Sequence, residues 1–474
     1  MMTQMRLIFY VLIAIVVLTA CSEAQPIETE SVVEVESVAE VESVGETAVP
    51  PTLSTKPDPT QTPPPDPTPN TEPTNAINDN EANELMFTLA FGSTSDAQAA
   101  LSRVVSANDK RFVGVLIELF RARQIGLINN LSFEDYIPAL QTLGGQTFAN
   151  DWGAWLEWYG NTDLTVPEGF ASWKGQILAR MDERFGDFLQ DRHPSNIRVE
   201  EIVWGGVLVD GIPPLDNPKM VEGDKATFMQ PFDAVFGIEI NGDARAYPLR
   251  IVDWHEMAND VIGGVPVSLA YCTLCGAAIA YDGRASNGTT YTFSSSGFLF
   301  RSNKLMYDRQ TETLWNQLTG EPVLGELVDT DVQLDLLPVV LTTWEAWQNQ
   351  HPNTVVVDIE TGFSRVYTPG AAYGDYFAAD ITMFPVWQRD EALATKDQVY
   401  ALNIDDTPKA YAIDLLTEAG VVNDVVAETA VILIASRGIV DVNGVSLRSG
   451  NEMTYSAGAE IRAYDRGEHT FSPG

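Results

Sequence analysis

The chain contains 474 residues, of which 45% are hydrophobic and 20% are charged, a length that suits two ordinary domains or one domain with a tail and a smaller module. Its 28 Lys and Arg against 66 Asp and Glu give a formal net charge of −38, which excludes nucleic acid as the main partner because such binding needs a basic surface. Three Cys and four His are too few for a disulfide scaffold or a multi-zinc array.

Residues 1–20 are predicted to be a signal peptide. An apolar run over 7–20 follows Arg6 and is too short for a comfortable membrane span. It ends in Leu-Thr-Ala-Cys21, which resembles the lipobox of bacterial lipoproteins and implies cleavage before Cys21 and lipidation of that residue. An ordinary secretory signal with a chance cysteine is the alternative. We therefore expect an extracytoplasmic protein, anchored to the membrane of the cell envelope or cell surface through Cys21.

Residues 21–80 are predicted to be a disordered tether. The stretch 28–46 contains seven Glu and no Lys or Arg, and 50–73 contains ten Pro among Thr and Asp. Such a sequence buries too little apolar surface to offset the ordering of its backbone. We expect a spacer between the membrane and the folded part.

Residues 81–191 have a helical hydrophobic period. Ser95 is predicted to cap one helix and Ser132 another, and further helices are expected over 152–159 and 171–189. Short helices with short loops predict a HEAT-like stack, which could dock a protein partner. Its tryptophans, spaced three residues apart from Trp152, indicate core packing more than a sugar-binding strip.

Residues 195–474 are predicted to form an internally duplicated β-rich domain, so the fold class is α+β. Residues 235–269 align without a gap to 399–433 at an offset of 164. The two copies are placed at about 230–330 and 395–470. In addition, Tyr-Asp-Arg at 307–309 is aligned with Tyr-Asp-Arg at 464–466, and the Asn-Asp pair shared by both copies is predicted to make a turn or a helix end.

The duplication is an internal control, because what only one copy has is not required by the fold. In this alignment the second copy replaces four soft-donor residues of the first with Ala, Ser, Ile and Ala. These four residues are His255, Cys272, Cys275 and Met306.

The sequence Cys272-Thr-Leu-Cys275-Gly has several physical interpretations. Two thiolates three residues apart can bind one metal ion, a redox pair can exchange thiols, a structural disulfide can close a short loop, and one cysteine can be an enzyme nucleophile. No second Cys-x-x-Cys completes a zinc ribbon, and His255 lacks the second His of a zincin.

The mixture of thiolate, imidazole and thioether favours a soft ion. We expect Cys272, Cys275, His255 and Met306 to bind Cu(I), with Zn(II) second. A thiol–disulfide oxidoreductase with His255 as proton carrier is the enzyme alternative, and a surface scaffold protein without catalysis is the third. Whether the protein is an enzyme stays open at this point.

Five polar side chains of the first copy are predicted to line a site or bind a polar ligand, although they can equally satisfy loop backbone groups. They are Ser296, Asn303, Tyr307, Arg309 and Gln317. The stretch 307–311 is predicted to be a hairpin turn between strands.

The chain resembles the DUF3179 family of bacterial domains at two long motifs. These are HEMANDVIGGVPVSLAYCTLCGAAIAYD and SSGFLFRSNKLMYDRQTETLWNQLTGEPVLGE. The resemblance is strongest over 195–360 and extends to the C-terminus. It implies no reaction, and Thr273 stands where typical members have Pro.

Overall fold

The computed structural model describes residues 75–472. The predicted signal peptide, the lipidation at Cys21 and nearly all of the predicted tether lie outside the described residues. The described residues belong to one compact unit. Among the described residues no helix is both long enough and apolar enough to span a membrane.

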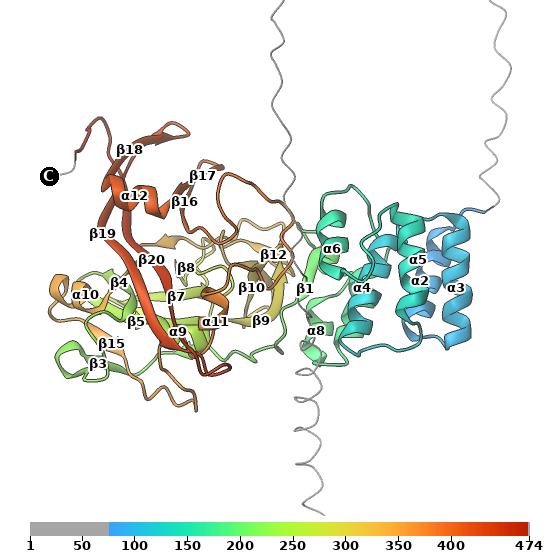
Figure 1. The fold of residues 1–474 in the computed structure, drawn as a ribbon, viewed down its shortest axis with the longest axis horizontal. Helices are drawn as coiled ribbons and strands as arrows, with labels where there is room; N and C mark the ends of the chain where they lie inside the picture. Colours follow the sequence, from blue (N-terminus) through green and yellow to red (C-terminus); the bar gives the residue numbers. More distant parts are fainter. Residues whose placement is uncertain (1–74, 473–474) are drawn as a thin grey trace, which may run out of the picture. The chain divides into compact units, whose positions relative to one another are not determined.

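A helical region comes first and a β-rich region follows, which confirms the predicted fold class (Figure 1). The seven helices of this first region run from residue 79 to residue 188. They are α2 (Asp79–Phe91), α3 (Thr94–Ala107), α4 (Phe112–Gln124), α5 (Phe133–Gly144), α6 (Trp152–Gly160), α7 (Phe170–Leu178) and α8 (Glu183–Phe188).

The observed ends of the helices differ from the prediction in two details. Ser132 caps α5 as expected, but α3 begins earlier than predicted and is capped by Ser93, whose hydroxyl accepts from the amide of Asp96 at 3.3 Å. The single helix expected over 171–189 is two, because Asp182 is extended and caps a new helix, α8. The side chain of a serine or aspartate can accept a hydrogen bond from a backbone N–H in place of a backbone carbonyl. Such a residue can therefore end one helix and cap the next.

The core of the helical region contains the predicted tryptophan packing. Trp155 is fully buried, and its ring packs edge to face against that of Phe148 with 5.1 Å between the ring centroids. The same hydrophobic cluster includes Val203 and Leu299 of the β-rich region. Helices and strands thus share one core within the described residues.

Three five-stranded sheets contain the first copy. The first has the order β1 (Ile202–Trp204), β9 (Phe293–Phe300), β10 (Asn303–Asp308), β11 (Leu314–Asn316), β12 (Pro322–Leu324). The short 3-10 helix η1 (Val199–Glu201) comes directly before β1. The second has the order β13 (Leu336–Leu337), β8 (Ala277–Asp282), β7 (Val265–Cys272), β6 (Met257–Ile262), β2 (Leu215–Asp216). The third has the order β14 (Val340–Thr343), β4 (Ala234–Ile240), β5 (Asp243–Pro248), β15 (Val355–Val357), β3 (Met220–Glu222).

Short helices accompany these sheets, and the second copy adds two smaller sheets. The helices are η2 (Gly223–Lys225), α9 (Leu249–His255), α10 (Trp344–Gln350) and α11 (Gly374–Phe377). The second copy consists of the pair β16 (Val399–Ile404) and β17 (Thr407–Ala412), the helix α12 (Ile413–Ala419), and a sheet of β18 (Val421–Val426), β19 (Thr429–Val445) and β20 (Glu452–Asp465).

The two copies repeat the same order of elements at the offset seen in the sequence. The bounds of β5, α9 and β6 each recur 164 residues later as those of β17, α12 and β18. The start of β7 recurs as the start of β19. Identical residues therefore stand at equivalent positions of equivalent strands.

The shared Asn-Asp pair does not form a turn or a helix end, so that prediction is wrong. It lies within β6 and β18, where each Asn bridges the backbone of a distant Phe. Asn259 accepts from the amide of Phe293 and donates to its carbonyl, and Asn423 does the same with Phe471. An Asn side chain can thus pair with a backbone as a neighbouring strand would.

The predicted alignment of the two Tyr-Asp-Arg stretches is also wrong. In the first copy Leu269 pairs with Ala280, and in the second copy Leu433 pairs with Ala463. The residues equivalent to 463–465 are therefore 280–282, which have the same sequence, Ala-Tyr-Asp. Met306 has no counterpart at Ala463, so the duplication says nothing about its role.

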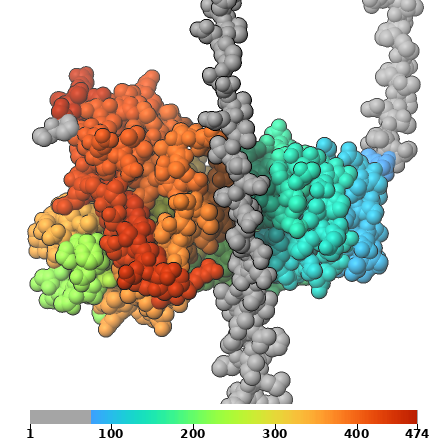
Figure 2. Space-filling view, in the orientation of Figure 1, coloured from blue at the N-terminus to red at the C-terminus, as the bar shows by residue number. Residues whose placement is uncertain are grey.

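The copies diverge after their last shared strand. A four-residue turn joins β7 to β8, whereas β19 and β20 continue as a long two-stranded arm (Figure 1). Three arm residues, Val440, Val442 and Tyr455, belong to the hydrophobic core of the first copy. Figure 2 shows this red C-terminal segment as a continuous surface band beside the orange and green residues.

Candidate functional site

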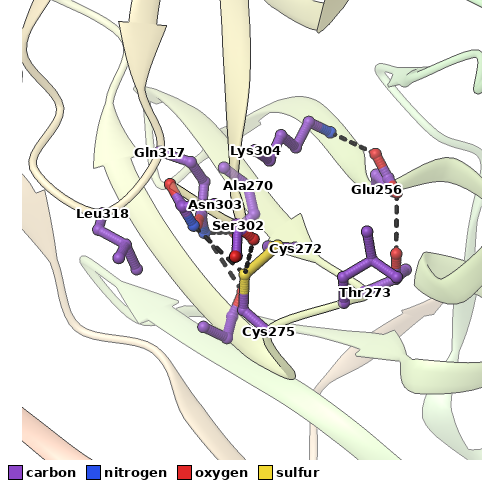
Figure 3. The surroundings of a disulfide bond; sticks show 12 residues. Glu256, Ala270, Cys272, Thr273, Cys275, Ser302, Asn303, Lys304, Gln317 and Leu318 are labelled. Atoms are coloured by element: carbon purple, nitrogen blue, oxygen red, sulfur yellow. Dashed lines mark hydrogen bonds and ion pairs between the residues drawn. A yellow bond between two sulfur atoms is a disulfide. The ribbon is translucent and has the colours of Figure 1, made fainter. Parts of the chain in front are cut away.

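Cys272 and Cys275 form a disulfide at the end of β7 (Figure 3). The turn closes with a hydrogen bond from the amide of Cys275 to the carbonyl of Cys272, at 3.2 Å. Gly276 follows with a φ of 63°, a conformation that glycine adopts without strain. Cys272 is buried, with 2% of its surface exposed, whereas Cys275 is exposed. Only Cys275 is therefore accessible to a partner.

The sulfur of Cys275 has two polar neighbours from the β9–β10 hairpin. Asn303 Nδ2 lies 3.4 Å from it and can donate to it, and the carbonyl oxygen of Ser302 lies 3.5 Å away. Gln317 holds the Asn303 amide group in place by accepting from the same Nδ2 at 2.9 Å. Gln317 in turn donates to the carbonyl of Ala270 at 3.0 Å. A fixed N–H donor thus faces the accessible sulfur.

The tip of this hairpin is strained. Arg301 and Ser302 have φ angles of 47° and 69°, in the left-handed region that favours glycine. Such conformations cost free energy and persist where the surroundings impose them. Here they place the Ser302 carbonyl and Asn303 beside Cys275.

A buried ion pair adjoins the same turn. Glu256 accepts from Lys304 at 2.8 Å and from the hydroxyl of Thr273, inside the Cys-x-x-Cys turn, at 3.0 Å. Both charged side chains are almost inaccessible, and burial lowers the pKa of Lys304 despite the carboxylate. Buried ion pairs contribute little net stability because desolvation opposes their attraction. A contribution to folding stability therefore does not by itself explain why this ion pair is present.

A second buried carboxyl group lies nearby in sequence. Asp253 is 2% exposed, and its Oδ1 has no hydrogen-bond partner in the described part of the chain. Burial raises the pKa of Asp253 to about 8. This carboxyl group is consequently protonated at neutral pH.

His255 is engaged by other groups than the cysteines. Its Nδ1 lies 2.8 Å from the carbonyl oxygen of Pro213 and its Nε2 lies 2.6 Å from the hydroxyl of Tyr367. The ring is fully buried, and burial lowers its pKa, so it is neutral at pH 7. In this arrangement neither ring nitrogen is available to a metal ion.

Met306 is placed in a hydrophobic core. It is fully buried in a cluster that contains Met257, Tyr281 and Trp315. Within residues 75–472 no three His, Cys, Asp or Glu side chains gather in a way that could hold a metal ion. The structure thus brings the two cysteines together but engages His255 and Met306 elsewhere.

The five predicted polar residues divide between two places. Asn303 and Gln317 adjoin the disulfide, whereas Tyr307 and Arg309 line a cavity of about 460 Å³. Ser296 donates to the carbonyl of Leu305 and so joins two strands. The hairpin turn after Tyr307 forms as predicted, between β10 and β11.

The sequence reasoning missed Asp253, Glu256 and Lys304. The repeat contained a signal for two of them, because Thr417 and Gly420 stand 164 residues after Asp253 and Glu256. Thr273 likewise becomes Arg437. The second copy has therefore lost the buried carboxyl groups together with the cysteines.

The family model for proteins of unknown function named DUF3179 matches residues 209–470, more than half of the chain. The chain therefore belongs to this family. No curated protein and no solved structure matches it.

Proposed function

We propose that this protein is an extracytoplasmic thiol–disulfide oxidoreductase, with Cys275 as the cysteine that meets the substrate. The observation that supports this proposal is the asymmetry of the pair: an exposed Cys275 faces the Asn303 N–H donor, and Cys272 is buried behind it. In a pair that exchanges with a partner, only one sulfur needs to be reached.

The exchange transfers two electrons from a substrate dithiol. A substrate thiolate attacks Cys275 Sγ, the bond between the two protein sulfurs breaks, and Cys272 leaves as a thiolate that takes up a proton. The second substrate thiolate then attacks the substrate sulfur of the mixed disulfide and releases Cys275 as a thiolate. The substrate becomes a disulfide, the protein a dithiol, and an external disulfide oxidant restores the protein.

Asn303 stabilises the thiolate that the second step releases. Its N–H already points at Cys275 Sγ, and a hydrogen bond to a charged acceptor is worth about 1.5–3 kcal/mol. Asn303→Leu is therefore expected to slow the exchange about tenfold or more. The replacement keeps the size of the side chain and removes the donor.

The test uses the full chain in detergent and a reduced peptide with two cysteines. Oxidised wild type should convert one equivalent of the peptide to its disulfide without air, measured by mass spectrometry as the loss of two hydrogen atoms from the peptide. Ser436→Ala, the second-copy counterpart of Cys272, is the control and should behave as wild type. Wild type that oxidises no more peptide than Cys275→Ser would contradict the proposal.

A trapping experiment assigns the roles of the two cysteines. Cys272→Ser, incubated with the disulfide-linked dimer of a peptide with one cysteine, should release one peptide as a thiolate and accumulate a mixed disulfide at Cys275 with the other, seen as added mass on the intact protein. Cys275→Ser should not, because Cys272 is buried. The opposite pattern would reverse the assignment and contradict the mechanism.

The copper or zinc site stays a prediction for the reduced protein. Two thiolates supply only two ligands, and His255 would have to release Pro213 or Tyr367 to become a third. Bound metal should be measured in reduced wild type and in Cys272→Ser. Equal loading of the two would contradict a cysteine site.

Membrane attachment through lipidated Cys21 is part of the proposal and rests on the lipobox alone. A Cys21→Ala chain should leave the membrane fraction in the native host. Binding of a partner by the helical region likewise stays a prediction.

A further inference from the structure

A second polar site in the molecule is the cavity of about 460 Å³ that Tyr307 and Arg309 line. Its size is within the range of small-ligand sites. It shares no lining residue with the residues labelled around the disulfide in Figure 3. It is not used by the proposed exchange reaction.

Two arginines of the cavity have spare hydrogen-bond donors. Arg184 donates to Asp210 at 2.8 Å and lies 3.6 Å from a carboxylate oxygen of Glu312. Arg309 donates to Asp216 at 2.7 Å and to Ser294 at 2.8 Å. A guanidinium group has five N–H donors, so both retain several. About a third of each side chain is exposed. A carboxylate that enters the cavity can therefore be bound.

Asp210 provides an acceptor that lacks a donor. Its Oδ2 accepts from both Arg184 and the hydroxyl of Tyr307, at 2.8 and 2.7 Å. Its Oδ1 is buried and has no hydrogen-bond partner among residues 75–472. Buried polar atoms are nearly always paired, and an exception requires an explanation. The Asp210 side chain as a whole is 37% exposed, so an N–H group of a ligand can reach its carboxylate from the cavity.

The remaining walls are apolar. Pro213, Pro214 and Phe363 contribute to the lining. His255 contacts two of them, because its ring centroid lies 5.0 Å from that of Phe363 and its Nδ1 lies 2.8 Å from the carbonyl oxygen of Pro213. This gives the neutral, buried His255 a role that does not involve the cysteines.

We infer that this cavity binds a small zwitterion with an apolar body, that is, an amino acid or a short peptide with free ends. The ammonium group would pair with Asp210 and the carboxylate with Arg309. A simple anion would meet three carboxylates, since Glu312 also lines the cavity, and a simple cation would meet two guanidinium groups. A ligand with both charges matches both kinds of partner.

Calorimetry on the full chain tests the inference with one dipeptide in three forms that differ only in the charges of their ends. L-leucyl-L-leucine should bind with a Kd below about 1 mM, that is, about 4 kcal/mol or more of binding free energy. Its C-terminal amide and its N-acetyl form each lack one charge and should bind about tenfold more weakly or worse. L-leucine is tested in parallel. Equal affinity of all three dipeptides, or no binding by either L-leucine or the free dipeptide, would overturn the inference.

Variants locate the site. Asp210→Asn and Arg309→Gln should each weaken binding of the free dipeptide about tenfold or more. Arg389→Gln is the control, because Arg389 pairs with Glu157 away from the cavity lining. Cys275→Ser should bind as wild type, which separates this inference from the proposed exchange. Unchanged binding in both cavity variants would refute the location.

Discussion

The two copies of the repeated unit share a backbone pattern but differ in what surrounds it. In the first copy the hydrogen bond between Tyr247 and Asp260 is buried, and in the second copy its equivalent between Tyr411 and Asp424 is partly open to solvent. The arm of the second copy covers the core of the first. Equal sequence motifs therefore stand in unequal dielectric surroundings.

This difference separates two kinds of residue. Those that both copies keep, such as the Asp of β6 and β18, hold neighbouring strands together. Those that only the first copy has, including Glu256, Thr273 and both cysteines, gather at one turn. The copy with the deeper core is thus the copy that contains the disulfide and the buried carboxyl groups, and burial raises the pKa of one of them, Asp253.

The largest expected contrast between the copies concerns one ion pair. Arg245 pairs with Asp260, which is 5% exposed, and Lys409 pairs with Asp424, which is 26% exposed. Arg245→Met should cost about 3–5 kcal/mol of unfolding free energy because it leaves a buried carboxylate unpaired. Lys409→Met should cost about 1 kcal/mol or less. Urea unfolding measures both, and equal costs would show that the second copy is as well buried as the first.

The core leucines should show no contrast. Leu269 and Leu433 stand at equivalent positions of β7 and β19, and both are fully buried. Each Leu→Ala change should cost about 2–5 kcal/mol in urea unfolding. A cost below about 1 kcal/mol in the second copy alone would indicate that its core is loosely packed.

The pH dependence of stability should be specific to the first copy. The pKa of Asp253 is raised from 3.8 to about 8, so between these values the folded protein binds a proton that the unfolded chain has released. Stability contributed by this group therefore falls as pH rises from about 4 to about 8 and then levels off.

Asp253→Asn tests this slope. The variant should lose the decline and be more stable than wild type at pH 8 by a few kcal/mol, because an amide cannot ionise. Thr417→Val, at the equivalent position of the second copy, is the control and should leave the pH profile unchanged. If the stability of Asp253→Asn still fell with rising pH as in wild type, the proton would belong to another group.

The sequence predicted the order of the regions and the repeat because both depend on local patterns. The helical period, the caps at Ser132 and the ungapped match at an offset of 164 are readable from neighbouring residues. The cysteine pair was also found this way. What was predicted wrongly, such as the turn at the Asn-Asp pair, depends on a partner far along the chain.

The rest of the site could not be predicted because it depends on burial. Lys304 is a surface residue by type, and only the fold shows that it is almost inaccessible beside Glu256. His255 looked like a ligand because the second copy lacks it, but its partners Pro213 and Tyr367 lie 42 and 112 residues away. Loss from one copy marks a specialised residue and does not say which of two sites it belongs to.

Apart from the leucines, which should show none, the smallest expected contrast between the copies concerns the shared asparagine. Asn259 is 6% exposed and makes two hydrogen bonds to Phe293, whereas Asn423 makes the same two bonds to Phe471 near the surface. Asn259→Ala should cost about 1–3 kcal/mol, because the freed backbone groups stay buried, and Asn423→Ala less than about 1 kcal/mol, because water replaces the side chain.

Hydrogen exchange distinguishes this explanation from a general loosening of the strand. In Asn259→Ala the amide of Phe293 should exchange faster while the amides of β6 remain protected, since the ladder between β6 and β7 is untouched. Exchange that rises across all of β6 would show that the asparagine holds the strand itself. In that case the shared residue would be part of the folding core of both copies, and the contrast between them would lie only in the residues around the disulfide.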